Sequence, residues 1–251
     1  MRNGTPKVAA FRRMLAMLDA VLADGGQSGI AAIARGIGMP VATAHRQVAT
    51  LVEEGYLARD QARRHIAGPR LIGMLHRLDE KQIVAACAAP VLHRLAAESG
   101  TVVQLGTFEN DMVTYRVKTG QGAGALFSRV GMQLEAYCSG IGKVLLANLP
   151  DDHRRAYLAT GPFPALTART ITDPAAIADE LERVRAQGFA FDAQEVADGL
   201  VCAAVPVSWP DGRVLAAISS SQFGEQVRPP EELLPALRAA ARDIERTAFG
   251  G

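Results

Sequence analysis

One short run of residues combines groups that hold an organic anion. Cys138-Ser139-Gly140-Ile141-Gly142-Lys143 opens a segment with helical spacing, so its backbone N–H groups are those left unpaired at a helix N-terminus. These groups and the helix dipole attract a carboxylate. Side chains that could line the same pocket follow on later segments: Asp192, Cys202, Ser219 and Ser221. Together they predict a site for a small carboxylic acid.

Two glycine-rich segments resemble nucleotide-binding motifs only in part. The run from Gly120 to Gly124 precedes an expected strand, whereas a dinucleotide fingerprint opens a helix. Tyr137 and Val144 stand where a phosphate-binding loop needs its first glycine and its Ser or Thr. Neither segment therefore predicts a nucleotide.

The cysteines raise the alternative of an enzyme. Cys138 or Cys202 would be the nucleophile and His93 or His153 the base, but no spacing supports such a pair. The three cysteines, with Cys87 as the third, are far apart and suggest neither disulfides nor a zinc site. We expect no enzymatic activity, no metal and no cofactor.

The first third of the chain has the register of a helix-turn-helix. Ala34, Gly38 and Ala44 stand where that motif needs a small residue, a turn glycine and a small packing residue. A second helix expected over 40–54 turns one face inward: Val41, Ala44, Val48, Leu51 and Val52. Its other residues suit a major groove, and we expect DNA contacts from Thr43, His45, Arg46, Gln47 and Thr50.

A basic hairpin follows this helix. Strands are expected over 55–59 and 63–67, and Arg59, Arg63 and Arg64 are placed to reach phosphates or a minor groove. Residues 1–82 hold 12 Lys and Arg against 7 Asp and Glu, a net charge of +5, while the rest holds 15 against 19, a net charge of −4. This asymmetry indicates that only the first part meets a polyanion.

Further helices must position the helix-turn-helix. One is expected over 6–23, with Thr5 as N-cap and Pro6 at its first position, and one over 30–36. An amphipathic linker helix is expected over 70–81. Apolar side chains on the first and last of these could form a dimer contact or only cover the domain's own core: Val8, Phe11, Leu15, Leu71, Met74, Leu75 and Leu78.

The second part alternates helices and strands. Helices are expected over 83–99, 140–148, 151–159, 174–187 and 230–248, and strands over 101–107, 112–118, 125–130, 189–195, 201–207 and 213–220. The pattern predicts an α+β fold with a DNA-binding domain at 1–69, a linker helix at 70–82 and a sensor domain at 83–251. No stretch approaches about 18 continuous apolar residues, so we expect a cytoplasmic protein without a membrane span.

Five segments of the chain resemble the IclR family of bacterial transcription regulators. They are residues 30–60, 67–74, 130–150, 188–207 and 216–221, and they include IARGIGMPVATAHRQV, AGPRLIGM, YCSGIGKVLLANLP and AAISSS. The resemblance implies a winged helix-turn-helix joined to a GAF-like effector domain. It implies a dimer, or a dimer of dimers, on a pseudo-palindromic operator whose binding is modulated by a small organic acid.

The resemblance also implies effector-binding positions. They correspond to Gly140, Ile141, Asp192, Leu200, Cys202, Ser219 and Ser221, and all but Ile141 keep the family's residue type. Tyr137 and Arg129 favour an aromatic or larger acid over a two- or three-carbon one. The recognition helix opens Pro40-Val41-Ala42-Thr43, where family members often have Lys and Ser at the second and third of these positions. This loss keeps open the alternative of a ligand-binding or protein-interaction module with weakened DNA contacts.

Overall fold

The computed structural model describes residues 8–75, 78–124, 126–224 and 227–250. The chain divides into two compact units, residues 1–79 and 80–251. The expected N-cap Thr5 and the first helical position Pro6 lie outside the described residues. Each unit has its own hydrophobic core, so each is described by itself.

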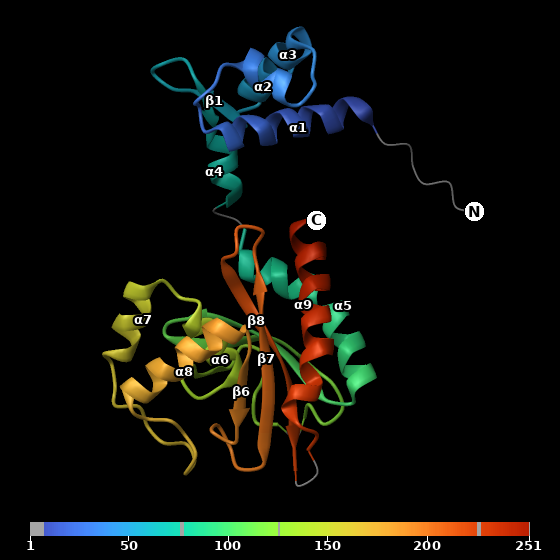
Figure 1. Ribbon diagram of the computed structural model, residues 1–251. Coiled ribbons are helices and arrows are strands. Elements are labelled where there is room, and N and C mark those ends of the chain that lie inside the picture. Colours follow the sequence, from blue (N-terminus) through green and yellow to red (C-terminus); the bar gives the residue numbers. More distant parts are fainter. Residues whose placement is uncertain (1–7, 76–77, 125, 225–226, 251) are drawn as a thin grey trace, which may run out of the picture. The chain divides into compact units, whose positions relative to one another are not determined.

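The first unit is a winged helix-turn-helix (Figure 1). Its elements are α1 (Ala9–Asp24), α2 (Ile30–Gly36), α3 (Val41–Glu53), β1 (Leu57–Arg59), β2 (His65–Ala67) and α4 (Pro69–Leu75). Gly25 ends α1 in the left-handed region, and Gly38, at φ +66°, makes the turn between α2 and α3. The small side chains of Ala34 and Ala44 are fully buried, as the motif predicted.

The core of this unit lies where α1, α2 and α3 meet β1. It contains Met17, Leu18, Val21, Ile30, Ala34, Met39, Ala44, Val48, Leu51 and Leu57. Two residues differ from the expected inward face of α3: Val41, in its first turn, is exposed, and Val52 is half-buried. The helix therefore buries a narrower stripe than its apolar residues suggested.

The second unit is built on a six-stranded antiparallel sheet. Its order is β5-β4-β3-β8-β7-β6, from β3 (Val102–Glu109), β4 (Met112–Thr119), β5 (Gln133–Glu135), β6 (Ala190–Ala193), β7 (Leu200–Ser208) and β8 (Val214–Phe223). The helices are α5 (Glu80–Ser99), α6 (Gly140–Ala147), α7 (Asp151–Leu158), α8 (Pro174–Gln187) and α9 (Leu234–Phe249), with a short 3₁₀ helix at Pro230–Leu233. This arrangement confirms the expected α+β architecture.

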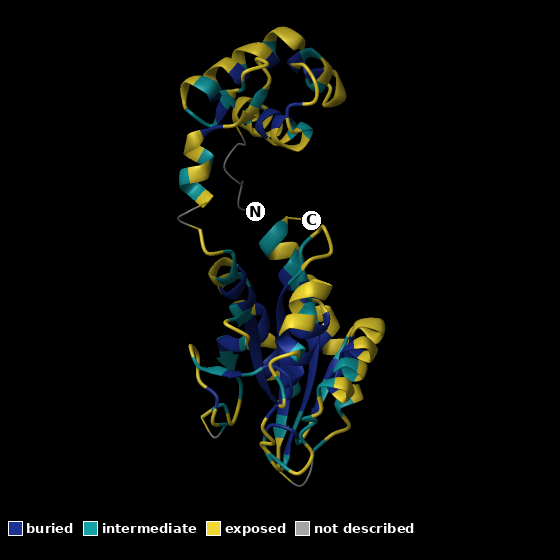
Figure 2. Cartoon of the chain, turned by 90° about the vertical axis from the view of Figure 1, so that its left-hand side faces the viewer, coloured by how far each residue is buried: buried dark blue, intermediate teal, exposed yellow. Residues whose placement is uncertain are grey.

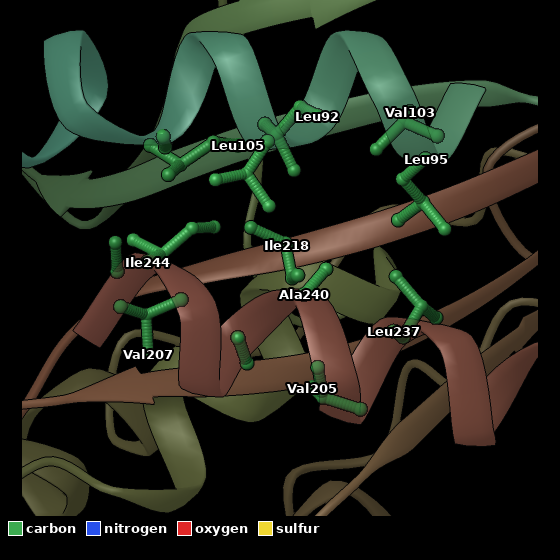
Figure 3. Close-up of a cluster of buried hydrophobic side chains, with 14 of the residues drawn as sticks. Leu92, Leu95, Val103, Leu105, Val205, Val207, Ile218, Leu237, Ala240 and Ile244 are labelled. Atoms are coloured by element: carbon green, nitrogen blue, oxygen red, sulfur yellow. The ribbon is translucent and has the colours of Figure 1, made fainter. Parts of the chain in front are cut away.

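Helices cover both faces of the sheet, and Figure 2 shows the strands buried between them. On one face α5 and α9 pack with Leu105, Val205 and Ile218 (Figure 3). On the other face α6 packs on β4, β7 and β8, and α8 packs against α6. Side chains alternate along a strand, so every second residue of a strand packs against α5 and α9, and the residues between them face α6.

Two sequence-based expectations about elements were wrong. No strand forms over the described part of 125–130; the short strand β5 lies at 133–135 instead. The ammonium of Lys118 accounts for the difference, because it donates to the carbonyls of Leu126 and Ser128 and holds that segment as a loop. The helix expected over 70–81 is also not continuous: α4 covers Pro69–Leu75, residues 78 and 79 are not helical, and α5 begins at Glu80.

Candidate functional site

The exposed side of α3 carries the residues expected to meet DNA. His45, Arg46 and Thr50 are exposed, while Thr43 and Gln47 are half-buried. The hydroxyl of Thr50 donates to the backbone carbonyl of Arg46 at 3.2 Å, one turn earlier. His45 and Arg46 are therefore the most accessible hydrogen-bonding side chains of the predicted set.

The wing is a tight hairpin, and its three arginines differ in whether they are free to contact phosphates. Asp60 accepts hydrogen bonds from the backbone N–H and the guanidinium of Arg64, at 2.8 and 2.9 Å, so Arg64 is engaged within the turn. Arg59 and Arg63 are exposed and form no ion pair with any described residue. Two of the three predicted arginines are thus available to phosphates.

His65 begins the second strand of the wing and connects it electrostatically to α3. Its partial burial, together with the nearby positive charges of Arg59 and His45, lowers its pKa. His65 is therefore neutral at pH 7 and adds no charge to the wing.

In the second unit, one cavity gathers all seven residues predicted to bind an effector. The cavity is narrow, because only about 20 Å³ of it is open to the centre of a water-sized sphere. The predicted residues on its wall are Gly140, Ile141, Asp192, Leu200, Cys202, Ser219 and Ser221. They come from the start of α6 and from three neighbouring strands, β6, β7 and β8. That they bind an effector stays a prediction.

The N-terminus of α6 opens onto this cavity. Ser139 caps the helix, since its hydroxyl accepts from the N–H of Gly142 at 3.1 Å and its carbonyl accepts from that of Lys143. The N–H groups of Gly140 and Ile141 are left without an intrahelical partner. Only glycine fits at position 142, because a Cβ there would lie 2.1 Å from the carbonyl oxygen of Ala136.

Asp192 is the acidic group of the cavity and is only 1% exposed. Its Oδ1 accepts from the N–H of Glu195 at 2.7 Å and more distantly from that of Val196. Burial, reinforced by the charge of Glu195, raises the pKa of Asp192 to about 7. A protonated Asp192 can donate a hydrogen bond to a bound carboxylate, which an ionised one would repel.

Lys143 is buried but does not face a ligand. Its ammonium contacts a carboxyl oxygen of Glu195, lies 3.4 Å from Glu180 Oε1 and donates to the carbonyl of Phe191 at 3.3 Å. These acceptors neutralise it within the protein. An ammonium that is paired in this way is not placed to bind a phosphate, which agrees with the sequence-based conclusion that this segment is no phosphate-binding loop.

The cavity also contains polar residues that the sequence analysis missed. Gln104 donates to the hydroxyl of Ser128 at 2.8 Å and accepts from Ser221 at 3.4 Å, and the thiol of Cys202 donates to Ser221 at 3.2 Å. A buried glutamine within the apolar run from Val102 to Leu105 was the available signal, since its amide needs partners. The tyrosine of the cavity, Tyr115, was missed as well.

One expectation about the pocket was wrong. Tyr137 and Arg129 do not line the cavity. Tyr137 is buried beside Phe163, with its hydroxyl donating to the carbonyl of Pro164. The aromatic residues on the wall are Tyr115 and Phe127.

Among the described residues, no cysteine and histidine are placed as a catalytic nucleophile and base, so the structure does not support the alternative of an enzyme. Burial raises the pKa of the Cys138 thiol to about 12 and that of the Cys202 thiol still further, so neither is a thiolate at neutral pH. His93 is exposed on α5, which covers the opposite face of the sheet from Cys202.

Within the described ranges, no group of three or more His, Cys, Asp or Glu side chains is arranged to hold a metal ion. A search of those same residues found no helix with the length and apolar character of a membrane span.

Comparison with known proteins covers nearly the whole chain. Residues 10–61 match the IclR helix-turn-helix domain, and residues 75–246 match the bacterial transcriptional regulator IclR C-terminal domain. The Pca regulon regulatory protein of Pseudomonas putida is 32% identical over 248 residues, covering 97% of this chain and 85% of that protein. The regulator BhcR of Paracoccus denitrificans is 30% identical, covering 97% and 87%.

Solved structures agree with these matches. IclR of Thermotoga maritima is 26% identical with a TM-score of 0.61, covering 95% of this chain and 98% of that one. An IclR homolog of Microbacterium hydrocarbonoxydans, complexed with 4-hydroxybenzoate, is 27% identical with a TM-score of 0.63, covering 94% and 98%. The chain therefore belongs to the IclR family, whose members are DNA-binding transcriptional regulators and not enzymes.

Proposed function

We propose that this regulator binds a pseudo-palindromic operator as a dimer or a dimer of dimers, and that a small organic acid bound in the cavity modulates the binding. One observation carries the proposal: residues predicted from separate segments, Gly140, Asp192, Cys202 and Ser219 among them, line a single cavity with the start of α6. Such convergence of polar groups from separate segments in one concave pocket is typical of ligand sites.

The chemistry of the wall supports a monocarboxylate. The N–H groups of Gly140 and Ile141 and a protonated Asp192 would surround the carboxylate. None of the described residues on the wall is Lys or Arg, so a second negative charge would be uncompensated. The apolar part of the wall suits an aliphatic chain or an aromatic ring: Leu126, Phe127, Leu134, Ile141, Val196 and Leu200. The 4-hydroxybenzoate bound by the Microbacterium homolog supports the aromatic alternative.

On DNA, we assign base reading to α3 and backbone contacts to the wing. Thr43, His45, Arg46, Gln47 and Thr50 form the set proposed for the major groove, with Arg46 as the residue able to contact guanine or clamp a phosphate. Arg59, Arg63 and Arg64 are proposed to contact phosphates or the minor groove, and Arg64 would first have to leave Asp60.

The test is fluorescence anisotropy with the upstream region of the protein's own gene, at a stated salt concentration. We expect Arg46→Ala to weaken binding by about 5- to 150-fold, as expected for loss of a base contact of about 1–3 kcal/mol. Arg246→Ala, on α9 in the second unit, is the matched control and should leave the affinity unchanged.

Three outcomes decide between the alternatives. Absence of preference over random DNA would refute operator recognition. Unchanged affinity after Arg46→Ala would favour a module with weakened DNA contacts. If benzoate, 4-hydroxybenzoate and pyruvate all leave the anisotropy curve unmoved, modulation by an acid of these types is ruled out.

A further inference from the structure

Tyr115 lies on the face of the sheet that carries the cavity. It lies on β4 directly opposite Gly106 of β3. Gly106 has no side chain, and Ile141 of α6 comes close to that position: a Cβ on Gly106 would lie 2.9 Å from Cγ2 of Ile141. The bare backbone at Gly106 thus brings the first turn of α6, which offers its free N–H groups, close to the strand pair that carries Tyr115.

Within the described residues, the hydroxyl of Tyr115 has no hydrogen-bond partner. The residue is 5% exposed and lines the cavity, yet its hydroxyl forms no hydrogen bond with any described residue. Tyr137 differs, since its hydroxyl donates to the carbonyl of Pro164. A hydroxyl that lines a cavity and has no partner in the described part of the chain is available to donate to a ligand bound there.

The protonation of this phenol limits what it can bind. Burial, together with the nearby Cys202, Asp192 and Cys138, raises the pKa of Tyr115 far above its ordinary value of 10. The hydroxyl therefore keeps its proton at all physiological pH values and is a neutral donor. A carboxylate oxygen is the strongest acceptor for such a donor.

We propose that Tyr115 is a ligand-binding residue whose hydroxyl donates a hydrogen bond to the carboxylate held at the N-terminus of α6. The inference rests on the proposed function, because it concerns the same cavity. It adds a side-chain donor to the N–H groups of Gly140 and Ile141. It also makes the site selective for an acid over its methyl ester, since the ester carbonyl is a weaker acceptor than a carboxylate.

The experiment compares the full-length protein with its Tyr115→Phe variant. Isothermal titration is performed with benzoate, 4-hydroxybenzoate and pyruvate, and then with the methyl ester of the acid that binds most tightly. We expect Tyr115→Phe to weaken binding of the acid by about 10-fold or more. Binding of the ester, already weaker in the wild type, should change less.

A second measurement separates ligand binding from a structural role. Because the hydroxyl has no partner among the residues that the structure describes, the ligand-free Tyr115→Phe variant should melt at the same temperature as the wild type or above it. Tyr157→Phe is the matched control: Tyr157 is buried beside Phe163 but does not line the cavity, so this variant should keep full affinity.

Each result has one reading. Equal affinity of wild type and Tyr115→Phe overturns this inference and leaves the proposed function in place. A lower melting temperature of the ligand-free Tyr115→Phe variant also overturns it, because the hydroxyl would then hold the fold. If the wild type binds none of the three acids, the ligand assignment of the proposed function falls, and the role of Tyr115 falls with it.

Discussion

At the scale of the residue, Asp192 governs how the cavity responds to pH. Its ordinary pKa of 3.8 is raised to about 7, mainly by burial. Between these values the native state holds a proton that the unfolded chain has lost. This residue's contribution to the free energy of unfolding therefore declines as the pH rises from about 4 to about 7.

A substitution of Asp192 by asparagine removes this pH dependence and keeps the shape. The amide side chain could still accept from the N–H of Glu195 and could donate to a ligand, as protonated Asp192 would. We expect Asp192→Asn to stabilise the protein at pH 8 by a few kcal/mol at most, and by less at pH 5. Urea denaturation at both pH values checks this; equal effects at the two would contradict the shifted pKa.

The affinity for a carboxylate ligand should also depend on the protonation of Asp192. Benzoate is ionised throughout pH 6–9, so ionised Asp192 repels it. We expect the wild-type affinity to fall about tenfold per pH unit above pH 7, and that of Asp192→Asn to stay flat. Isothermal titration at pH 6, 7, 8 and 9 measures both. A wild-type affinity that is constant over this range would exclude a protonated Asp192 as a donor.

At the scale of the element, Lys143 joins the helix of the cavity to the strand that carries Asp192. It extends from α6 to Glu180 of α8, to the carbonyl of Phe191 on β6 and to Glu195 in the turn that follows. The same turn donates the N–H of Glu195 to Asp192. The buried cation thus fixes the N-terminus of α6 relative to the acidic group of the site.

Lys143→Met should therefore be strongly destabilising. It leaves Glu195, whose side chain is 7% exposed, as an uncompensated buried charge, and breaking such a pair costs about 3–5 kcal/mol. The double variant Lys143→Met, Glu195→Gln should recover much of the loss, because no unpaired charge remains at Glu195. Chemical denaturation of the three proteins provides the comparison. A double variant no more stable than the single one would show that packing, and not charge, is the cause.

At the scale of the whole molecule, the first unit leaves an apolar surface uncovered. Val8 is 67% exposed, and Phe11 and Leu15 lie one and two turns further along α1 with exposed fractions of 60% and 44%. Ile72 and Leu75 of α4 are also exposed. Patches of this kind mark interaction sites, which supports the proposed dimer on two operator half-sites.

Phe11→Asp should weaken that dimer. A charge in an apolar contact is desolvated on association, so we expect sedimentation velocity to show dissociation at a protein concentration at which the wild type stays assembled. Binding to a two-half-site operator should weaken more than binding to a single half-site. Phe223→Asp is the control, since Phe223 is 67% exposed and lies in the second unit. Dissociation of the Phe223 variant alone would place the contact elsewhere.

The sequence by itself determined the elements and much of the candidate site. Gly25 ends α1 and Gly38 makes the turn between α2 and α3, both in conformations that favour glycine. Ala34 and Ala44 are buried as the motif requires. These features follow from the sequence because turn chemistry and helical spacing are local properties. Residue types and the family resemblance both pointed to Gly140, Asp192 and Ser219, which lie far apart in the chain but line one cavity.

Only the tertiary structure decided the rest. The pairing of β3 with β4 and β8 brings Tyr115 and Gln104 to the cavity, and a loop held by Lys118 replaces the strand expected at 125–130. Burial moves the pKa of Asp192 to about 7, and Lys143 is neutralised by glutamates from two other segments. Register, desolvation and charge pairing depend on residues distant in sequence, so local patterns could not reveal them.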